Sequence, residues 1–315
     1  MIEIITPSRL HITLIDLNAD IGRVDGGIGL TLDEPCIHIT AEKSKYTIIT
    51  GNSKLANRMK KSADLVAEAL GSGIHIDIKK DYPSHVGLGS GTQSALAAGM
   101  AVNKLYDLGL SVNSIAIKVG RGGTSGIGVA SFEKGGFILD GGHKFKEKKA
   151  FSPSAASKAP PAPVLFQKDF PDWNIVLAIP NLKGAFSARE VDIFQKYCPI
   201  PLKEVQTLCH IILMQMLPAI VEEDIVEFGS AINKIQEIGF KRREVELQSP
   251  KIKELIKLMQ EYCYGAGMSS FGPVVYGIAD HPNKVKSTIQ KFLDDTLGGE
   301  VRVTKARNEG AYIVI

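Results

Sequence analysis

The stretch PSHVGLGSGTQ, residues 83–93, constrains the fold more than any other part of the chain. It places three glycines directly before SALAAGMAVNKLY, whose small and apolar residues predict a helix from about Gly89 to Tyr106. A helix N-terminus presents unpaired N–H groups and partial positive charge, and preceding glycines let an anion approach the backbone. The alternative is a glycine-rich turn with an ordinary Ser or Thr cap. We expect a phosphate-binding loop formed by Gly87, Gly89, Ser90, Gly91, Thr92 and Gln93.

Two further glycine-rich stretches strengthen the phosphate interpretation. Residues 122–128 read GGTSGIG, and residues 264–273 read YGAGMSSFGP, which we expect to be a loop followed by a strand. The stretch at 83–93 contains neither a Walker GxxxxGK[ST] pattern nor a dinucleotide GxGxxG pattern. Three such loops in one chain favour a shared polyanionic ligand, with Ser125, Ser269 and Ser270 as weaker phosphate contacts.

Hydrophobic periodicity predicts the secondary structure. The strands expected in the first half are 2–6, 29–32, 36–41, 46–50, 74–78 and 136–140, and the further helices are 53–70 and 111–120. The strands expected in the second half are 173–179, 274–279, 301–304 and 311–315, and the helices are 202–217, 223–238, 249–262 and 283–293.

The domain boundary is predicted from composition. Residues 150–163, AFSPSAASKAPPAP, contain four prolines and few large apolar side chains, so we place the inter-domain connection there. The expected domains are residues 1–155 and 156–315. Strands and helices alternate without the regularity of βαβ units, which predicts an α+β fold class.

Charge and cysteine content exclude several function classes. The chain has 37 basic and 34 acidic residues, a net charge of +3, and no long basic tract, so we expect no nucleic-acid partner. Its four cysteines form no CxxC pair, which argues against a zinc site. It has no apolar run of about 18 residues and no signal-peptide pattern, so we predict a cytoplasmic protein with no membrane partner.

The motifs resemble those of the GHMP small-molecule kinases. PSHVGLGSGT is similar to their PxxxGLGSS phosphate loop, and GAGMSSFGP is similar to their third, glycine-rich motif. The resemblance covers most of the chain. It implies an N-terminal domain like ribosomal protein S5 domain 2 and a ferredoxin-like C-terminal domain. One position departs from the pattern: Gly128 stands where mevalonate-type kinases carry a catalytic Asp, and a glycine cannot act as a general base.

Other stretches resemble a second family on the same scaffold. PSRLHITLIDLN, GRVDGGIGL and GRGGTSGIGVASFEKGGFILDGGH are similar to β-ribofuranosylaminobenzene 5′-phosphate synthases, including the missing Asp. This resemblance implies condensation of 5-phosphoribosyl 1-pyrophosphate with 4-aminobenzoate, or with 4-hydroxybenzoate, and release of CO₂ and pyrophosphate in methanopterin biosynthesis. It also implies Mg²⁺ bound with the pyrophosphate, no organic cofactor, small-molecule substrates and a homodimer, for which the apolar segment 208–217 is a candidate surface.

The implied chemistry suggests roles for polar residues near the N-terminus. Asp16 is the first catalytic candidate, as a carboxylate near the ribose or as a possible Mg²⁺ ligand; the alternative is an Asp that caps a turn. Arg23 is expected to bind a phosphate or the benzoate carboxylate, and the alternative is a surface arginine. Ser8, Arg9 and His11 are further substrate-binding candidates, with a structural role equally open for His11.

Two weaker candidates lie elsewhere. Arg189, in the stretch GAFSARE, could reach the substrate, although a plain surface helix is the simpler interpretation. His143 is expected to be a histidine of a surface loop.

Two other functions compete with the synthase. A GHMP-type kinase would phosphorylate a small alcohol with ATP; the loops favour it and Gly128 opposes it. A binding module without catalysis would only sense a phosphorylated metabolite.

Overall fold

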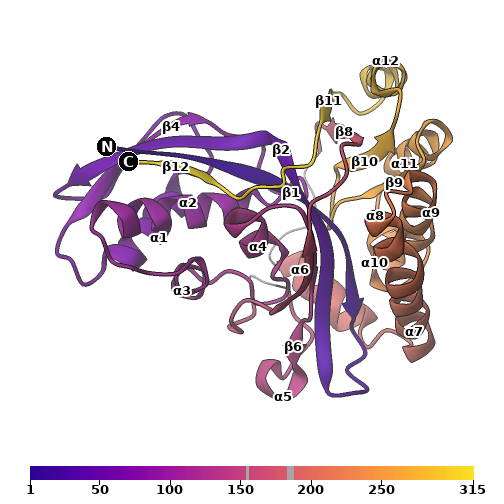
Figure 1. Cartoon of the computed structure of the whole chain (residues 1–315), viewed down its shortest axis with the longest axis horizontal. Helices are drawn as coiled ribbons and strands as arrows, with labels where there is room; N and C mark the ends of the chain where they lie inside the picture. The colour runs from indigo at the N-terminus through magenta and orange to yellow at the C-terminus, as the bar shows by residue number, and fades with distance from the viewer. Residues whose placement is uncertain (154–155, 183–187) are drawn as a thin grey trace.

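Two long strands organise the first half of the chain. In the computed structural model, which describes residues 1–153, 156–182 and 188–315, β1 (Ile2–Asp16) and β2 (Arg23–Ser44) pair antiparallel along most of their length (Figure 1). The pairing has irregularities between Thr6 and Ser8 and between His11 and Thr13. These two strands form the centre of an eight-stranded sheet whose path runs β12-β1-β2-β4-β3.

The other strands of this sheet attach to β1 and β2 or to their neighbours. They are β3 (Ile48–Thr50), β4 (Gly73–Lys80), β5 (Phe137–Asp140), β6 (His143–Lys144), β7 (Val164–Lys168) and β12 (Tyr312–Val314). Strand β12 pairs with β1, which brings the two chain termini together (Figure 1). The division into domains 1–155 and 156–315 stays a prediction, and the pairings add that β7 and β12 join the first sheet.

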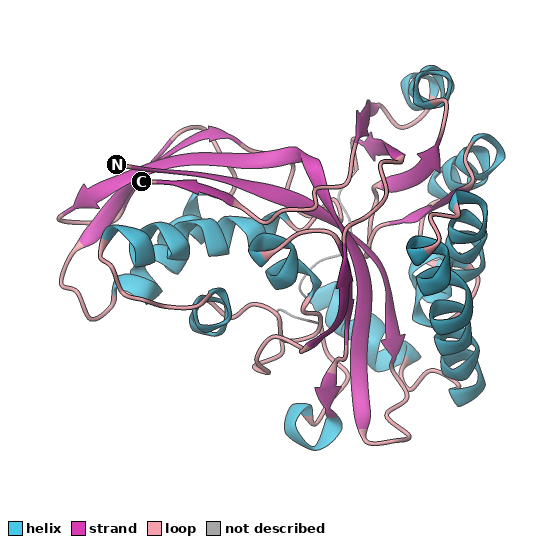
Figure 2. Cartoon of the chain, viewed as in Figure 1, coloured by secondary structure: helices cyan, strands magenta, loops and turns pink. Residues whose placement is uncertain are grey.

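Helices pack against one face of this sheet, as Figure 2 shows. They are α1 (Ala56–Ala67), α2 (Ser90–Leu105) and α4 (Ile127–Glu133), with α3 (Val112–Lys118) against α2 and the short α5 (Phe145–Lys148) after β6. The interior of α2 consists of small and apolar residues, and its buried residues include Ala95, Ala97 and Ala98. Small side chains let α2 lie close to its neighbours, and it contacts β1, β2, α1 and α4.

The second half builds a smaller sheet covered by helices. Its strand order is β11 (Gly299–Thr304), β8 (Asn174–Pro180), β10 (Val275–Ala279) and β9 (Gly265–Met268), all antiparallel. The helices of this half are α6 (Ala188–Tyr197), α7 (Leu202–Ile211), the π-helical turn η1 (Ile212–Met216), α8 (Leu217–Val221), α9 (Ile225–Gln236), α10 (Gly239–Glu246), α11 (Pro250–Tyr262) and α12 (Pro282–Asp295). Helices α9, α11 and α12 pack on the small sheet. The predicted α+β class is confirmed.

Two predictions about elements were wrong, and several elements, α4, α10 and β7 among them, were not predicted. The separate strands expected at 2–6, 29–32 and 36–41 are parts of the two long strands β1 and β2. Glycines suggested turns there, but Gly29 lacks a side chain because a Cβ would collide with Ile127 of α4 and with the backbone of Leu10. The loop expected at 264–273 contains the buried strand β9.

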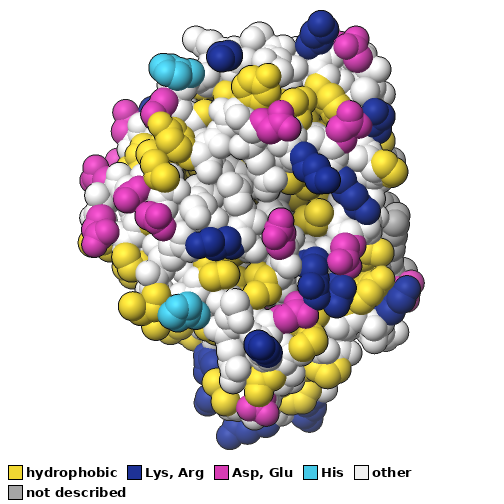
Figure 3. All heavy atoms as spheres, turned by 90° about the vertical axis from the view of Figure 1, so that its right-hand side faces the viewer, with side chains coloured by type: hydrophobic (Ala, Val, Ile, Leu, Met, Phe, Trp, Pro, Cys, Tyr) yellow, Lys and Arg dark blue, Asp and Glu magenta, His cyan; other side chains and the backbone are white. Residues whose placement is uncertain are grey.

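The outer helical side carries charged side chains of both signs interspersed with apolar ones (Figure 3). Within the described residues, the helical run Leu202–Val221 is long and apolar enough to cross a membrane, by length and composition only, and 33% of it is buried. Core helices of water-soluble proteins meet the same criteria, so the expectation of no membrane partner stays a prediction.

An aromatic cluster joins the two halves. Phe228 of α9 is fully buried, and its ring centroid lies 6.1 Å from that of Phe137 on β5, 5.2 Å from Phe170 and 5.5 Å from Trp173. The cluster therefore connects a helix of the second half with a strand of the first sheet.

We predict that Phe228→Ala lowers the free energy of unfolding by about 3–5 kcal/mol, because it leaves a cavity among three rings. Urea unfolding followed by tryptophan fluorescence measures this change. Val226→Ala, at an exposed position of the same helix, is the control and should change stability by no more than about 0.5 kcal/mol. Equal effects of the two substitutions would contradict a bridging role for the cluster.

Candidate active site

A cleft of about 490 Å³ lies where the glycine loop meets the second half of the chain. Residues of β1, of the loop 84–92 and of α1 line one part of it, and residues of α6, α10 and the loop 270–272 line another. In Figure 1, α1 and α3 lie on one side of the region and α6 and α10 on the other. We call the first part the N-wall and the second the C-wall.

The glycine loop has a backbone that only glycine fits. Gly87 and Gly89 have φ of 101° and 81°, in the left-handed region. A Cβ on Gly87 would collide with the carbonyl of Ser269, and a Cβ on Gly89 would lie 3.1 Å from the side chain of Arg9. Helix α2 begins directly afterwards at Ser90, so its first turn points into the cleft.

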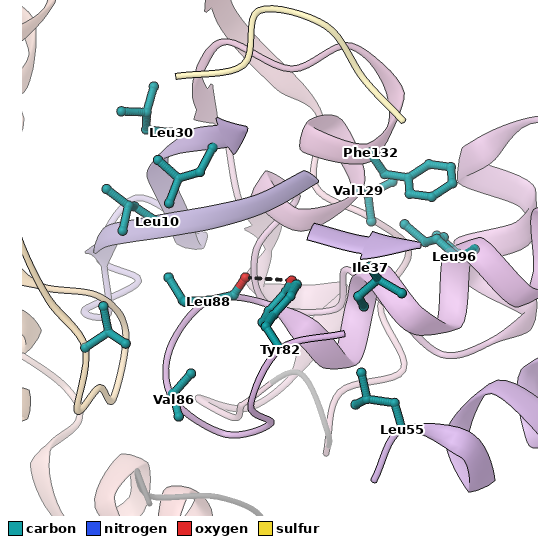
Figure 4. Packing of buried hydrophobic residues seen from close by; sticks show 14 of the residues in the cluster. Leu10, Leu30, Ile37, Leu55, Tyr82, Val86, Leu88, Leu96, Val129 and Phe132 are labelled. Atoms are coloured by element: carbon teal, nitrogen blue, oxygen red, sulfur yellow. Dashed lines mark hydrogen bonds between the residues drawn. The ribbon is translucent and has the colours of Figure 1, made fainter. Parts of the chain in front are cut away.

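The apolar residues of the loop hold it in place. Val86 and Leu88 are buried in the core beside Leu10 and Leu55, and the Tyr82 hydroxyl donates to the Leu88 carbonyl at 3.2 Å (Figure 4). The backbone of the glycine loop is therefore held in place by the core of the first half.

Hydrogen bonds join the loop, strand β1 and the stretch 269–274. The His11 N–H donates to the Ser269 hydroxyl at 3.0 Å, which in turn donates to the Gly87 carbonyl at 2.7 Å. The Ser270 N–H donates to the His11 carbonyl at 2.9 Å. Ser269 thus connects protein segments, whereas Ser270 lines the cleft.

Arg9 lies at the centre of the cleft. Its Nη1 donates to the Gly87 carbonyl at 2.5 Å, and burial lowers its pKa to about 10. The guanidinium therefore stays charged at neutral pH. The charges of Glu190 and Glu244 act on it from the C-wall.

The N-wall is cationic. Arg58 of α1 packs its guanidinium against Gly91, where a Cβ would collide with it, and Arg121 and Lys61 line the same wall. Burial and the charge of Arg58 lower the pKa of Arg121 to about 10. The Nε of Arg121 is buried without a hydrogen-bond partner among the described residues. Cations around a helix N-terminus suit a polyanion such as pyrophosphate.

The C-wall contributes two carboxylates. Glu244 of α10 is buried beside the fully buried Lys241, which ion-pairs with it and donates to the carbonyls of Met268 and Ser270 at 3.1 and 3.2 Å. Burial raises the pKa of Glu244. Glu190 of α6 also lines the cleft, and burial together with the charge of Glu244 raises its pKa to about 7.

The same wall is apolar next to these carboxylates. Phe194 and Phe271 line the cleft there, and their ring centroids lie 6.4 Å apart with the rings tilted by 49°. Phe240 packs against both rings, at 4.7 Å from Phe194 and 5.8 Å from Phe271. Leu14 of β1 lines the cleft and belongs to the same apolar cluster, so this part of the cleft edge is apolar and largely buried.

A polar corner lies beside strand β2. The Asp140 carboxylate accepts from the Ser125 hydroxyl at 3.0 Å and from the Gly126 N–H at 2.9 Å, and burial raises its pKa to about 6. A Cβ on Gly27 would lie 3.0 Å from the Ser125 Oγ and 3.2 Å from His11 Nε2. Burial lowers the pKa of His11 well below its ordinary value, so this ring is neutral at pH 7.

The expectation that His143 is a surface residue was wrong. It is 6% exposed, and its Nδ1 lies 2.7 Å from a carboxylate oxygen of Asp25 while its Nε2 lies 2.8 Å from the Pro160 carbonyl. Lys148 is buried against the same carboxylate and donates to the Thr124 hydroxyl at 3.1 Å. This charged cluster anchors the loop that carries Thr124 into the cleft.

Two known family domains match the chain. The GHMP kinases N terminal domain matches residues 57–136, and the GHMP kinases C terminal domain matches residues 216–295. The chain is 52% identical over 318 residues to β-ribofuranosylphenol 5′-phosphate synthase of Archaeoglobus fulgidus, covering 100% of both chains. It is 46% identical over 330 residues to the protein of the same name from Methanothermobacter thermautotrophicus, covering 100% of this chain and 99% of the relative.

The chain belongs to the β-ribofuranosylphenol 5′-phosphate synthase family. It is therefore an enzyme of this family, and the relatives' names contain phenol where the sequence resemblance suggested aminobenzene. The homoserine kinase of Cytophaga hutchinsonii has a similar structure, with a TM-score of 0.69 at 17% identity over 99% of this chain and 97% of that one. The predicted GHMP-kinase-like fold is confirmed.

The predicted site residues of this synthase-family chain fall into two groups. Those that line the cleft are Arg9, His11, Gly87, Gly89, Ser90, Gly91, Thr92, Ser125 and Ser270. Gln93 and Ser8 are buried in the structure instead: the Gln93 amide donates to the Gly128 carbonyl at 2.8 Å, and the Ser8 hydroxyl is enclosed in β1.

Asp16 and Arg23 do not line the cleft. Asp16 lies on β1 two residues beyond Leu14, which does line the cleft, and its Oδ1 accepts from the N–H groups of Asn18 and Ala19 at 2.7 and 3.0 Å. Arg23 donates to the carbonyls of Gly141 and Gly142. The Asp16 contacts match its turn-capping alternative, whereas Arg23 is a part-buried residue at the start of β2 rather than a surface arginine; the catalytic roles of both stay predictions. For Arg189, the side chain and the preceding residues 183–187 lie outside the described part of the chain.

The synthase family's departure from the kinases has a structural counterpart at Gly128. A Cβ there would lie 3.1 Å from Cγ2 of Thr92, which is tighter than an ordinary van der Waals contact. Any side chain at position 128 would therefore press on Thr92 of the glycine loop, which would have to shift by a few tenths of an ångström.

Sequence reasoning missed Arg58, Lys61, Arg121, Glu190 and Glu244. These residues come from four separate segments with no shared motif. Arg121 and Glu190 lie in stretches that were singled out for other residues, whereas Arg58, Lys61 and Glu244 lie in none of them.

We predict that Arg121→Gln weakens binding of pyrophosphate about 10- to 100-fold, because it removes a charge-assisted hydrogen bond of about 1.5–3 kcal/mol. Isothermal titration calorimetry with magnesium pyrophosphate measures this. Lys118→Gln, an exposed substitution on the neighbouring helix α3, is the control and should bind like wild type. Unchanged affinity of the Arg121 variant would remove this arginine from the anion site.

Proposed function

We propose that the enzyme transfers the phosphoribosyl group of 5-phosphoribosyl 1-pyrophosphate to a para-substituted benzoate, releasing CO₂ and pyrophosphate and forming a C-riboside. It would thus be a decarboxylating pentosyltransferase. The relatives' names favour 4-hydroxybenzoate as the ring substrate, because its product is a ribofuranosylphenol 5′-phosphate. The alternative substrate is 4-aminobenzoate.

The observation that carries the proposal is the contrast between the two walls of one cleft. The N-wall offers Arg58, Arg121 and the first turn of α2 to an anionic donor. The C-wall offers an aromatic surface of Phe194 and Phe271 to a flat acceptor. Phosphate groups on one side and a benzoate ring on the other bring the reacting carbons together between them.

Binding at the N-wall would also favour departure of the pyrophosphate. Arginine guanidiniums and helix N–H groups stabilise the charge that grows on the leaving group. Arg9, in the middle of the cleft, is placed to hold the benzoate carboxylate or the 5′-phosphate. The electrons for bond formation come from the para substituent of the ring, so the reaction needs no organic cofactor.

We propose Mg²⁺ as a companion of the pyrophosphate, where it would act as a Lewis acid. The loop 84–92 of the N-wall provides hydroxyl oxygens in Ser84, Ser90 and Thr92. Within residues 1–153, 156–182 and 188–315, no group of three His, Cys, Asp or Glu side chains could hold a metal ion. We therefore propose a Mg²⁺ ion that is held mainly by phosphate oxygens, with the Ser90 hydroxyl as the ligand from the protein.

The setting of the reaction is also part of the proposal. We place it in methanopterin biosynthesis in the cytoplasm of an archaeon, without nucleic-acid or membrane partners. We further propose a homodimer. Leu213 and Met214, each 63% exposed on the π-helical turn, are candidates for its interface, and light scattering tests the mass.

The decisive experiment measures two products at once. Protein, Mg²⁺, 5-phosphoribosyl 1-pyrophosphate and a benzoate labelled in its carboxyl group should yield pyrophosphate and labelled CO₂ in equal amounts, only when both substrates are present. ADP formation from ATP with a small alcohol, without pyrophosphate release, would overturn the proposal in favour of a kinase. Binding of the donor without any turnover would favour the sensing module.

The same assay tests Asp16. If its carboxylate acts in catalysis, Asp16→Asn lowers kcat by about 10²–10⁴-fold, the range of a lost general base. If it caps the turn at Asn18 and Ala19, kcat is retained and thermal stability falls by the equivalent of about 1 kcal/mol. Asp20→Asn, at an exposed position in the same turn, is the matched control.

A further inference from the structure

The proposed function leaves one carboxylate of the C-wall, Glu190, without a role. Glu190 and Phe194 lie four residues apart on α6, so they project from the same face of the helix, and both line the cleft. The helix thus presents a carboxylate beside an aromatic ring. Phe271 and Leu14 extend the apolar surface on the other side of Phe194.

The two carboxylates of this wall differ in their partners. Glu244 forms an ion pair with Lys241, whose ammonium group also donates hydrogen bonds to two backbone carbonyls. No salt bridge engages Glu190 within the described residues, although the charge of Arg9 reaches it. A carboxylate that lines a cleft and has no committed partner is available to a ligand.

The orientation of the ring follows from the bond that forms. The carbon that bears the carboxylate bonds to the ribose, so that end of the ring must face the donor, and the cationic N-wall attracts the carboxylate in the same direction. The carboxylates of the C-wall repel it. The para substituent therefore points away from the donor, toward α6.

We propose that Leu14, Phe194 and Phe271 form the ring subsite, and that Glu190 is the general base for the para hydroxyl of 4-hydroxybenzoate. This inference rests on the proposed function and names a catalytic group for it. In this proposal the C-wall binds the ring substrate and supplies the base for its reaction.

The step balances as follows in protons and electrons. The O–H bond of the phenol breaks, its proton passes to Glu190, and the oxygen electron pair enters the ring. The ring carbon bonds to C1 of the ribose as the C1–O bond to pyrophosphate breaks. Loss of CO₂ returns the electron pair to the ring, and the oxygen takes its proton back from Glu190.

The electrostatic environment of Glu190 suits this proton transfer. Burial and the negative charge of Glu244 raise the pKa of Glu190 to about 7, while Arg9 of β1 acts in the opposite direction. Lys241, also on α10, has its charge balanced by Glu244. The basic form of Glu190 is lost as the pH falls below about 7, so turnover of the phenol should fall there with it.

The test compares two ring substrates in one variant. With 4-hydroxybenzoate, Glu190→Gln should lower kcat about 10²–10⁴-fold and abolish the acidic limb of the pH profile near 7. With 4-aminobenzoate the loss should be much smaller, because the amine can donate electrons while keeping its protons as an iminium ion. Asp192→Asn, an exposed change on the same helix, should leave both rates unchanged.

Equal losses with the two rings, or no loss with either, would overturn the role of Glu190. Failure of the wild-type enzyme to release pyrophosphate and CO₂ would instead refute the proposed function, so the two failures are distinct. A second variant tests the subsite: Phe194→Leu should raise KM for the ring substrate and leave KM for the ribosyl donor unchanged. Equal changes in both values, or no change in either, would show that the ring does not bind there.

Discussion

The hydroxyl of Ser269 is the interaction on which the cleft depends. It accepts from the backbone of β1 at His11 and donates to the glycine loop at Gly87, so one side chain positions three segments that are distant in the sequence. The contact is possible because Gly87 has no Cβ to collide with the Ser269 carbonyl. The protein's own packing therefore requires a glycine at this position, whether or not an anion binds there. The phosphate loop and the second half of the chain are therefore placed by the same contact.

Around this junction each half supplies a different chemistry. The first half brings cations and helix N–H groups, and the second brings aromatic rings and carboxylates. Neither set alone distinguishes a synthase from a kinase, because both enzymes bind phosphates. The family relation separates them, because relatives at 46–52% identity over the whole chain are named as synthases. The chain thus keeps the GHMP kinase domains, and we propose that it uses them to bind anions.

The sequence predicted what is encoded locally. The loop at 83–93, the start of α2 and most helices follow from glycine, hydroxyl and apolar patterns within a few residues. The long strands were misread because Gly29 signals close packing against α4, a contact between residues about a hundred positions apart. Arg58, Arg121, Glu190 and Glu244 share no motif, since only the fold brings them to one cleft. For Asp16, the hydrogen bonds to Asn18 and Ala19 match the alternative interpretation from the sequence, an Asp that caps a turn.

Strand β1 has a mechanical consequence. It is one continuous strand of 15 residues that forms part of the floor of the cleft and contacts α2 and α4 of the first half as well as α7 and α10 of the second. Its backbone is hydrogen-bonded to β2 on both sides of His11. A motion that separated the two halves would have to break the contacts of α7 and α10 with this strand or distort its hydrogen bonds to β2. The floor of the cleft is therefore one element that both halves share.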